Sequence, residues 1–347
     1  MSTLRLWLHV LGLSLLLISR LGFALDLTGA GASLPYPVYA KWAAAFYEET
    51  GHKVNYQSMG SGGGQQQIVT GTVDFGASDD PVSEDWLQAH DLIQFPAVAG
   101  GIVPIVNLPG IAAGDLRLTP EVLADIYLGV IRRWNDEAIE ALNPGLSLPN
   151  AEIVVVYRSD GSGTTYVWTD YLASTTTQWE RKVGRGKAVK WPLGQGGKGN
   201  EGVAAYVQQL KYAIGYIEYS YANQNQLAWV QLMNRAGYFV APEQRTFRAA
   251  MEQADWQVPG MAVNLTNQPG ADSWPITAAS FILLRRKAKS VERRRVVLEF
   301  FDWALTHGSQ VVRDLGYIPI PSSAVNTLHQ QWSQTLHDEA GNPVWDP

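Results

Sequence analysis

Residues 158–165, with the sequence RSDGSGTT, most constrain how this chain can fold and what it can bind. They follow an apolar, β-branched run at residues 153–156 and precede a segment at residues 166–172 that is expected to be helical. A strand, a glycine-rich turn and a helix in this order bring backbone N–H groups together at the helix N-terminus, where an anion can bind. The alternative is an ordinary capped helix, with Ser162 as its N-cap and Arg158 as a solvated charge. Features elsewhere in the chain favour the anion site.

Two further loops share the glycine and hydroxyl content of this stretch. One surrounds Ser33 and the other surrounds Ser61, and each follows a predicted strand and precedes a predicted helix. In an open α/β sheet, ligands bind beyond the carboxyl ends of the strands, where such loops lie. Three loops of this kind, with an arginine beside one of them, favour an anion site over turns that are glycine-rich for structural reasons alone.

The whole chain reads as an α/β pattern. Strands are predicted at residues 25–31, 54–57, 73–78, 100–107, 214–219 and 278–284, and helices at residues 37–50, 65–70, 120–128, 201–210, 290–306 and 322–336. We expect Gly51 to end the first of these helices and Thr119 to cap the third, with Pro120 at its first position. Pro104 indicates that its strand lies at an edge or is a crossing segment. The loop at residues 194–200 lacks the Gly-x-x-x-x-Gly-Lys-Ser/Thr spacing of a nucleotide-binding loop. We therefore expect this loop to be structural or adjacent to a hinge.

Residues 1–24 have the pattern of a secretory signal peptide. Arg5 precedes an apolar run at residues 10–18, and small residues end at Ala24, after which we expect cleavage. The apolar run is well short of the ~20 residues that a membrane-spanning helix needs. The mature chain would keep 24 basic and 32 acidic side chains, a net charge of −8. We expect a soluble, secreted protein whose acidity disfavours nucleic acid or an anionic membrane as its main partner.

The composition limits the chemistry further. The length of 347 residues, with 46% hydrophobic and 17% charged side chains, suits two globular domains. Because there is no cysteine, disulfides, zinc–thiolate sites and nucleophilic thiols are excluded. The six histidines are scattered without metal-ligand spacing, so we expect no metal and no cofactor. Asp79 and Asp80 could form a metal pair, but a capped turn before Pro81 is favoured.

A secreted phosphatase is the alternative from a different functional class. It would use Ser61 or Ser162 as a nucleophile. Ser162 lacks the glycine two residues earlier that a nucleophile elbow requires, because position 160 is aspartate. Metal-dependent hydrolysis would need a cluster of carboxylates and histidines that the sequence does not display. We therefore expect a binding protein and not an enzyme.

Seven segments carry a close resemblance to a known family. They are LTGAGASLPYPVYAKWAAAFYEETG, VDFGASDDPV, IYLGVIRRWNDEAIEALNPG, YRSDGSGTTYVWTDYL, VKWPLGQGGKGNEGVAAYVQ, AIGYIEYSYA and SWPITAASFILL. Together they resemble the periplasmic phosphate-binding proteins of phosphate ABC transporters. The matching segments extend from Leu27 to Leu284.

The resemblance implies a two-lobed α/β fold of the type 2 periplasmic-binding class, with a hinge of two crossing segments. Lobe I would comprise residues 25–103 and 277–347, and lobe II residues 104–276. The implied phosphate ligands are Ser33, Leu34, Ser61, Asp79, Arg158, Ser162, Gly163 and Thr164. Asp160 would orient Arg158. The implied partners are inorganic phosphate and the inner-membrane ABC permease, and the implied protein is a periplasmic monomer.

Asp79 makes sense in an anion site only if the anion carries a proton. Monobasic and dibasic phosphate both have a P–OH group that can donate to a carboxylate, whereas sulfate has none at neutral pH. A carboxylate facing sulfate would be repelled, so it would select phosphate by excluding its competitor. We therefore expect a high-affinity phosphate receptor. A receptor for sulfate or another tetrahedral oxyanion is the alternative among binding proteins.

Overall fold

The computed structural model describes residues 24–256 and 258–345. The predicted signal peptide therefore lies outside the described residues, apart from Ala24. The strands are β1 (Asp26–Gly31), β2 (Lys53–Ser58), β3 (Phe75–Ser78), β4 (Leu92–Val106), β5 (Arg117–Leu118), β6 (Val154–Arg158), β7 (Gln195–Gly197), β8 (Ala213–Glu218), β9 (Ala228–Trp229), β10 (Gln231–Met233), β11 (Phe239–Val240), β12 (Thr277–Arg285) and β13 (Ile318–Pro319).

The helices alternate with these strands through most of the chain. They are α2 (Tyr36–Thr50), α3 (Ser61–Thr70), α4 (Glu84–Ala89), α5 (Pro120–Tyr127), α6 (Glu137–Leu142), α7 (Gly163–Thr175), α8 (Thr177–Lys182), α9 (Gly199–Gln209), α10 (Tyr219–Gln224), α11 (Gln244–Glu252), α12 (Val291–Thr306), α13 (Ser309–Asp314) and α14 (Ser322–Thr335), with a 3-10 helix at Pro259–Met261. Within the described part of the chain, no helix is long and apolar enough to cross a membrane.

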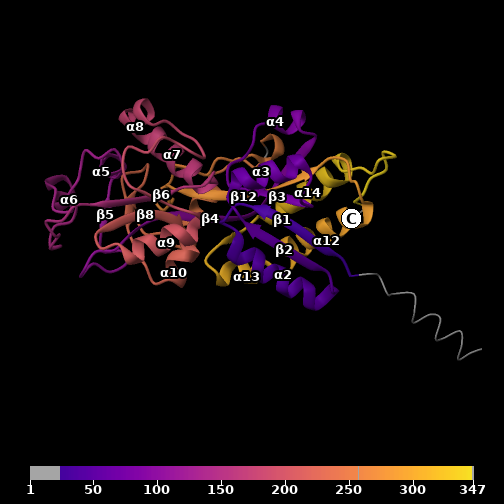
Figure 1. Cartoon of the computed structure of the whole chain (residues 1–347), viewed down its shortest axis with the longest axis horizontal. Helices are drawn as coiled ribbons and strands as arrows, with labels where there is room; N and C mark the ends of the chain where they lie inside the picture. The colour runs from indigo at the N-terminus through magenta and orange to yellow at the C-terminus, as the bar shows by residue number, and fades with distance from the viewer. Residues whose placement is uncertain (1–23, 257, 346–347) are drawn as a thin grey trace, which may run out of the picture.

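One mixed sheet connects two lobes. Its strand order is β2-β1-β3-β12-β4-β8-β6-β7, with β9 and β13 also paired to β4. We call the half with β1, β2, β3 and β12 lobe I, and the half with β6, β7 and β8 lobe II. Figure 1 shows α3 and α4 on one side of the lobe I strands and α2 and α13 on the other; α7 and α8, and then α9 and α10, flank the lobe II strands in the same way. The predicted α/β, two-lobed fold is confirmed.

Strand β4 passes from one lobe into the other. From Leu92 to Gly101 it pairs with β12, and from Ile102 to Val106 it pairs with β8. All of its residues are buried. The predicted strand at residues 100–107 is thus a crossing segment and not an edge, and it begins eight residues earlier than predicted.

The second crossing segment lies directly beside the first. Ile102 donates a backbone hydrogen bond to Ile276 at 2.8 Å, and Gly101 is in register with Thr277. Two adjacent crossings form a hinge about which lobes can rotate. The predicted lobe boundaries fall at these segments, and the exact division of the chain stays a prediction.

Large aromatic side chains hold the core together in this cysteine-free chain. Six tryptophans are fully buried, and they belong to both lobes: Trp42, Trp134, Trp168, Trp179, Trp274 and Trp332. In lobe II, Trp168 stacks on Tyr216 with ring centroids 4.6 Å apart. Burial of such rings provides hydrophobic stabilisation, whereas smaller secreted domains without so large a core depend on disulfides. Trp168 lies on α7 and Tyr216 on β8, so this contact also fixes the helix that carries the residues described next.

Candidate functional site

The predicted ligand residues lie at the ends of strands and the beginnings of helices. Ser33 and Leu34 follow β1, Ser61 begins α3, and Asp79 follows β3 in lobe I. In lobe II, Arg158 ends β6, Ser162 is the N-cap of α7, and Gly163 and Thr164 are the first residues of that helix. All eight residues are buried. Polar side chains are rarely buried without a role in hydrogen bonding or binding, so this burial sets them apart from ordinary loop residues.

Ser61 joins the two lobes at the centre of the site. Its Oγ accepts hydrogen bonds from the backbone N–H groups of Asp79 and Gly163, each at 3.1 Å. Next to it, Gly62 N donates to Gly161 O across the lobes at 2.9 Å. Three predicted residues, Ser61, Asp79 and Gly163, are therefore in direct contact, although they come from three separate loops.

Gly163 has no room for a side chain at this contact. A Cβ atom there would lie 2.4 Å from Ser61 Oγ and 2.6 Å from Asp79 Cβ. Carbon atoms do not approach so closely without displacing their neighbours. The glycine thus allows the first turn of α7 to meet the lobe I loops.

Arg158 is buried and held by polar contacts. Its Nε donates to Asp160 Oδ1 at 2.8 Å and its Nη2 to Asp160 Oδ2 at 2.5 Å, while Nη1 donates to Thr164 Oγ1 at 3.3 Å. Only 3% of Arg158 is exposed. The alternative that Arg158 is a solvated charge is wrong, whereas Ser162 does cap the helix, accepting from Thr165 N at 3.0 Å. The structure thus has both the helix cap at Ser162 and the buried guanidinium of Arg158.

Asp160 is well placed to fix the guanidinium of Arg158. Burial by itself raises the pKa of Asp160, but the hydrogen bond and charge of Arg158 outweigh burial and leave the pKa below its usual range. The backbone N–H of Gly199 also donates to Asp160 Oδ1, at 3.0 Å. Two-point contact with a carboxylate uses the Nε/Nη2 edge of the guanidinium, which leaves the Nη1 side free to face other groups.

Asp79 is the unusual group in this set. It is 2% exposed, and among the described residues its Oδ1 atom has no hydrogen-bond partner. Burial raises the pKa of Asp79 to about 7, even though the nearby Ser280 hydroxyl and the positive charge of Arg158 act in the opposite direction. A buried acceptor without a donor is costly, on the order of 1–3 kcal/mol, and more when it is charged. A ligand that brings a proton to Oδ1 would remove that cost.

The loop around Ser33 is held against the same region by other groups. Gly31 O accepts from the N–H groups of Met59 and Gly60, each at 2.9 Å, which places the Ser33 loop beside the start of α3. Ser33 Oγ accepts from Asn200 Nδ2 at 2.9 Å. The described residues show no hydrogen bond between Ser33 and the Ser61 contact itself.

Several site residues escaped prediction from the sequence. Asn200 lies at the end of the glycine-rich loop that was expected to be structural or adjacent to a hinge, yet its side chain contacts Ser33 across the lobes. The same signal that marked the other three loops, glycines before a helix, was present there. Lys187 was also missed: its Nζ lies 3.2 Å from Asp80 Oδ2 and donates to Gln65 Oε1 at 2.6 Å, which ties lobe II to lobe I.

Glu218 is a second buried carboxyl group near the hinge. Its Oε2 accepts from Ser220 N at 2.9 Å and from Tyr317 OH at 2.7 Å, and Tyr317 OH is also 2.7 Å from Leu34 O. Burial raises the pKa of Glu218 to about 8. In the sequence, the only indication of this buried carboxyl group was an acidic residue within the apolar run of β8.

Comparison with known proteins agrees with this geometry. A family model described as a PBP superfamily domain matches residues 23–307. A PstS phosphate-binding protein from Pasteurella multocida is 56% identical over 93% of this chain and 94% of its own length. The chain belongs to the PstS family of phosphate-binding proteins. A PstS protein from Haemophilus influenzae is 58% identical over 90% of this chain and 93% of its own.

Solved structures agree with the fold. A high-affinity periplasmic phosphate-binding protein, PfluDING, bound with phosphate, has a TM-score of 0.71 at 19% identity, covering 92% of this chain and 96% of that one. At this identity the likeness concerns the fold alone. The PstS family assignment rests on the sequence relatives, and the fold likeness supports the two-lobed architecture described above.

Proposed function

We propose that this protein binds inorganic phosphate between its two lobes and delivers it to an ABC importer. The phosphate ligands would be Ser33, Leu34, Ser61, Asp79, Arg158, Ser162, Gly163 and Thr164, with Asp160 orienting Arg158. Relatives named phosphate-binding protein PstS, aligned over most of both chains, support the assignment of phosphate as the ligand.

The observation that carries the proposal is the buried Oδ1 atom of Asp79, an acceptor without a donor in a setting that is otherwise rich in donors. A phosphate P–OH group can supply the missing proton, and Arg158 can neutralise the remaining charge. Sulfate has no proton to supply, so it would leave two unpaired acceptors facing each other in a buried site. We expect this difference to cost sulfate on the order of 10³-fold in affinity.

The hydroxyl groups of Ser61 and Ser162 favour binding over hydrolysis. Each accepts a backbone hydrogen bond, and in the described part of the chain neither is hydrogen-bonded to a histidine or carboxylate that could act as a general base. A serine nucleophile needs such a base. We therefore propose that the protein is not an enzyme, and incubation with a chromogenic phosphate ester should give no turnover.

The cellular setting follows from the same proposal. The protein would be secreted through a signal peptide cleaved after Ala24 and would act as a monomer in the periplasm. Its partner would be the inner-membrane permease of the phosphate importer. Mass spectrometry of the protein purified from the periplasm should give a mature chain that begins at Leu25.

Isothermal titration of the phosphate-stripped protein tests the proposed function. In the cleft we expect tight binding of one phosphate, binding of the isosteric and protonated arsenate, and no measurable binding of sulfate at neutral pH. Equal affinity for phosphate and sulfate would support the alternative of a general oxyanion receptor and would overturn the role given to Asp79.

A further inference from the structure

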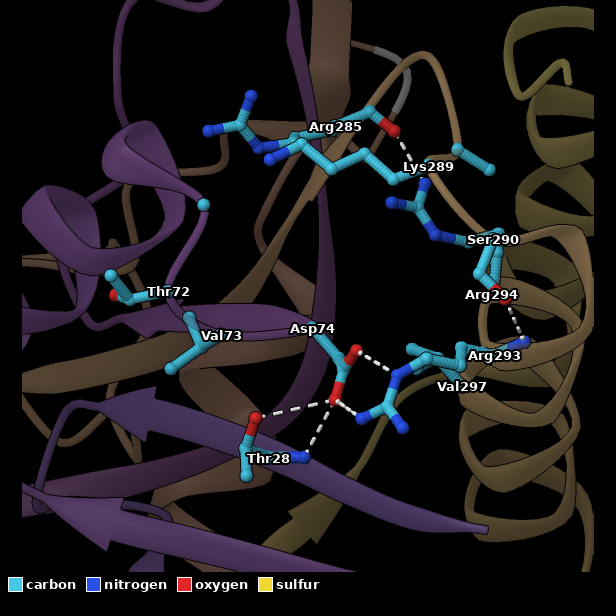
Figure 2. A pocket seen from close by; sticks show the side chains of 12 residues that line it. Thr28, Thr72, Val73, Asp74, Arg285, Lys289, Ser290, Arg293, Arg294 and Val297 are labelled. Carbon is cyan, nitrogen blue, oxygen red and sulfur yellow. Dashed lines mark hydrogen bonds and ion pairs between the residues drawn. The ribbon is translucent and has the colours of Figure 1, made fainter. Parts of the chain in front are cut away.

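A second polar pocket lies in lobe I, away from the cleft between the lobes. It has a volume of about 260 Å³ and lies between the end of β12, the beginning of α12 and the loop at residues 71–74. Figure 2 shows basic side chains from β12 and α12 gathered around it. The cleft residues follow the carboxyl end of β3, whereas this pocket contains Asp74, which precedes β3. The pocket therefore lies toward the opposite end of that strand and shares no residue with the proposed phosphate site.

The lining of the pocket is strongly basic. It has four cations, Arg285, Lys289, Arg293 and Arg294, and one carboxylate, Asp74. These side chains give a local charge of +3 in a chain whose overall formal charge is −6. Such a concentration of positive charge on an acidic protein is where an anion would be drawn.

The single carboxylate is already occupied. Arg293 donates to Asp74 through Nε at 2.9 Å and Nη2 at 2.6 Å, and Thr28 N donates to the same carboxylate at 2.7 Å (Figure 2). Among the described residues, no carboxylate lies within ion-pair distance of Arg285, Lys289 or Arg294. Three positive charges thus line the pocket without an ion-pair partner among the described residues.

Arg294 is the most deeply buried of these three basic residues. It is only 7% exposed, and its Nη1 donates to the backbone oxygen of Arg285 (Figure 2). Burial, together with the neighbouring charge of Arg285, lowers the pKa of Arg294 to about 10, although the negative charge of Asp74 acts in the opposite direction. Arg285 has a buried Nε with no hydrogen-bond partner in the described part of the chain. Buried charges in proteins are normally paired, so the buried guanidinium of Arg294, beside the half-buried Arg285, is a place where an anion is expected.

We propose that this pocket binds a small tetrahedral oxyanion, a sulfate or phosphate group either free or carried as an ester on a small molecule. Guanidinium groups present paired donors that match two oxygens of such a group. Thr72 and Ser290 add hydroxyl groups to the lining, and the N-terminus of the 16-residue helix α12 contributes its positive end. The one carboxylate of the pocket, Asp74, already accepts hydrogen bonds from Arg293 and Thr28, so unlike the cleft the pocket accepts sulfate.

Sulfate is the probe that separates this pocket from the cleft. The full mature chain is loaded with one equivalent of phosphate, dialysed, and titrated with sodium sulfate against sodium chloride of equal ionic strength. We expect saturable binding of one sulfate. Arg294→Gln should weaken it about tenfold or more, because a charge-assisted hydrogen bond is lost. Lys289→Gln, at an exposed position, should weaken it up to about fivefold.

Arg295→Gln is the matched control, because Arg295 is exposed on the same helix and does not line the pocket. It should leave sulfate binding unchanged, and none of the three variants should alter phosphate binding in the cleft. A parallel titration with glycerol phosphate distinguishes the sources: tighter binding than sulfate indicates an ester ligand, and weaker binding a free anion. No saturable sulfate binding to the wild-type chain, or an equal loss in Arg295→Gln and Lys289→Gln, would overturn the proposal.

Discussion

Asp79 is the one acidic side chain among the eight proposed ligand residues. Its burial and its partnerless Oδ1 would make it unfavourable in a site for a fully deprotonated anion. In a site for phosphate the same features become the basis of selectivity. Two predictions test this reading of the residue.

Replacing Asp79 with asparagine should change the ratio of phosphate to sulfate affinity. Asparagine keeps an acceptor oxygen for the P–OH group, removes the negative charge and adds N–H donors that sulfate can use. Phosphate affinity should fall modestly or stay similar, while sulfate binding rises from negligible to measurable. Competition titrations at pH 8 and fixed ionic strength give the ratio. An unchanged ratio would mean that the shape of the site, and not the carboxylate, rejects sulfate.

Sulfate binding to the cleft should also depend on pH. Because burial raises the pKa of Asp79 to about 7, the neutral carboxyl group becomes populated below that pH and the carboxylate above it. Sulfate keeps its charge over this range, so its affinity should rise as the pH falls from 8 to 6. Titrations of the Arg294→Gln chain reduce the contribution from the second pocket. The same series in an Asp79→Asn background should be flat, and an equal slope in both backgrounds would assign the effect to another group.

At the scale of elements, the first turn of α7 must approach the lobe I loops closely. Gly163→Ala would place a methyl group against Ser61 Oγ and Asp79 Cβ, at 2.4 and 2.6 Å. Overpacking of this kind costs about 1–3 kcal/mol, and here it acts on the closed arrangement of the lobes. We expect phosphate affinity to fall by about tenfold or more, measured by titration, with little change in the thermal unfolding of the phosphate-free protein.

Gly161→Ala is the matched control for this prediction. An added Cβ at Gly161 would meet its nearest neighbour, Gly62 Cα, at 3.5 Å, which is an ordinary contact. Phosphate affinity should therefore stay within about threefold of the wild type, under about 1 kcal/mol. Equal losses in the two variants would show that loop flexibility, and not the close approach at Gly163, limits binding.

The elements that the sequence predicted well are those with a local signal. Helix α5 begins with Thr119 as its cap and Pro120 at its first position, and α2 ends at Gly51 with a positive φ of 76°, both as expected. Helix α3 begins at Ser61, four residues before the predicted start at Gln65. The prediction was late because the first turn contains three glycines, which favour a loop over a helix. The tertiary contact of Gly62 with Gly161 overrides that preference.

Long-range contacts were beyond the reach of sequence patterns. The first half of β4 was missed because it is buried on both faces and shows no alternation of polar and apolar residues. The contact of Asn200 with Ser33 depends on how the two lobes meet, and no feature of the loop at residues 194–200 fixes its partner. In contrast, glycine and hydroxyl residues marked three loops of the proposed site in the sequence, and the resemblance to the family supplied the full set of eight residues.

At the scale of the whole molecule, the lobes are joined by several polar contacts. Ser61 Oγ accepts a hydrogen bond from Gly163 N, and Lys187 forms an ion pair with Asp80. Tyr221 OH donates a hydrogen bond to Ser33 O at 2.7 Å. The chain also passes between the lobes at two adjacent segments, β4 and the residues that lead into β12, which are joined by the hydrogen bond from Ile102 N to Ile276 O. A ligand that adds contacts to both lobes should therefore shift the population towards this closed arrangement.

Small-angle scattering should detect that shift. The radius of gyration should be smaller for the phosphate-loaded protein than for the phosphate-stripped protein. Gly163→Ala should reduce or abolish the difference at saturating phosphate, whereas Gly161→Ala should keep it. Identical profiles for the loaded and stripped wild-type protein, with binding confirmed by titration, would contradict closure around the ligand.

The most direct test of the central claim is a crystal structure of the phosphate-loaded protein near pH 8. We predict one phosphate between the lobes, in contact with Arg158 and Asp79. One phosphate oxygen should lie about 2.5–2.7 Å from Asp79 Oδ1, the distance of a hydrogen bond from P–OH to a carboxylate. A cleft without phosphate, or an Asp79 Oδ1 that turns away from a phosphate bound there, would contradict the proposed function of this carboxyl group.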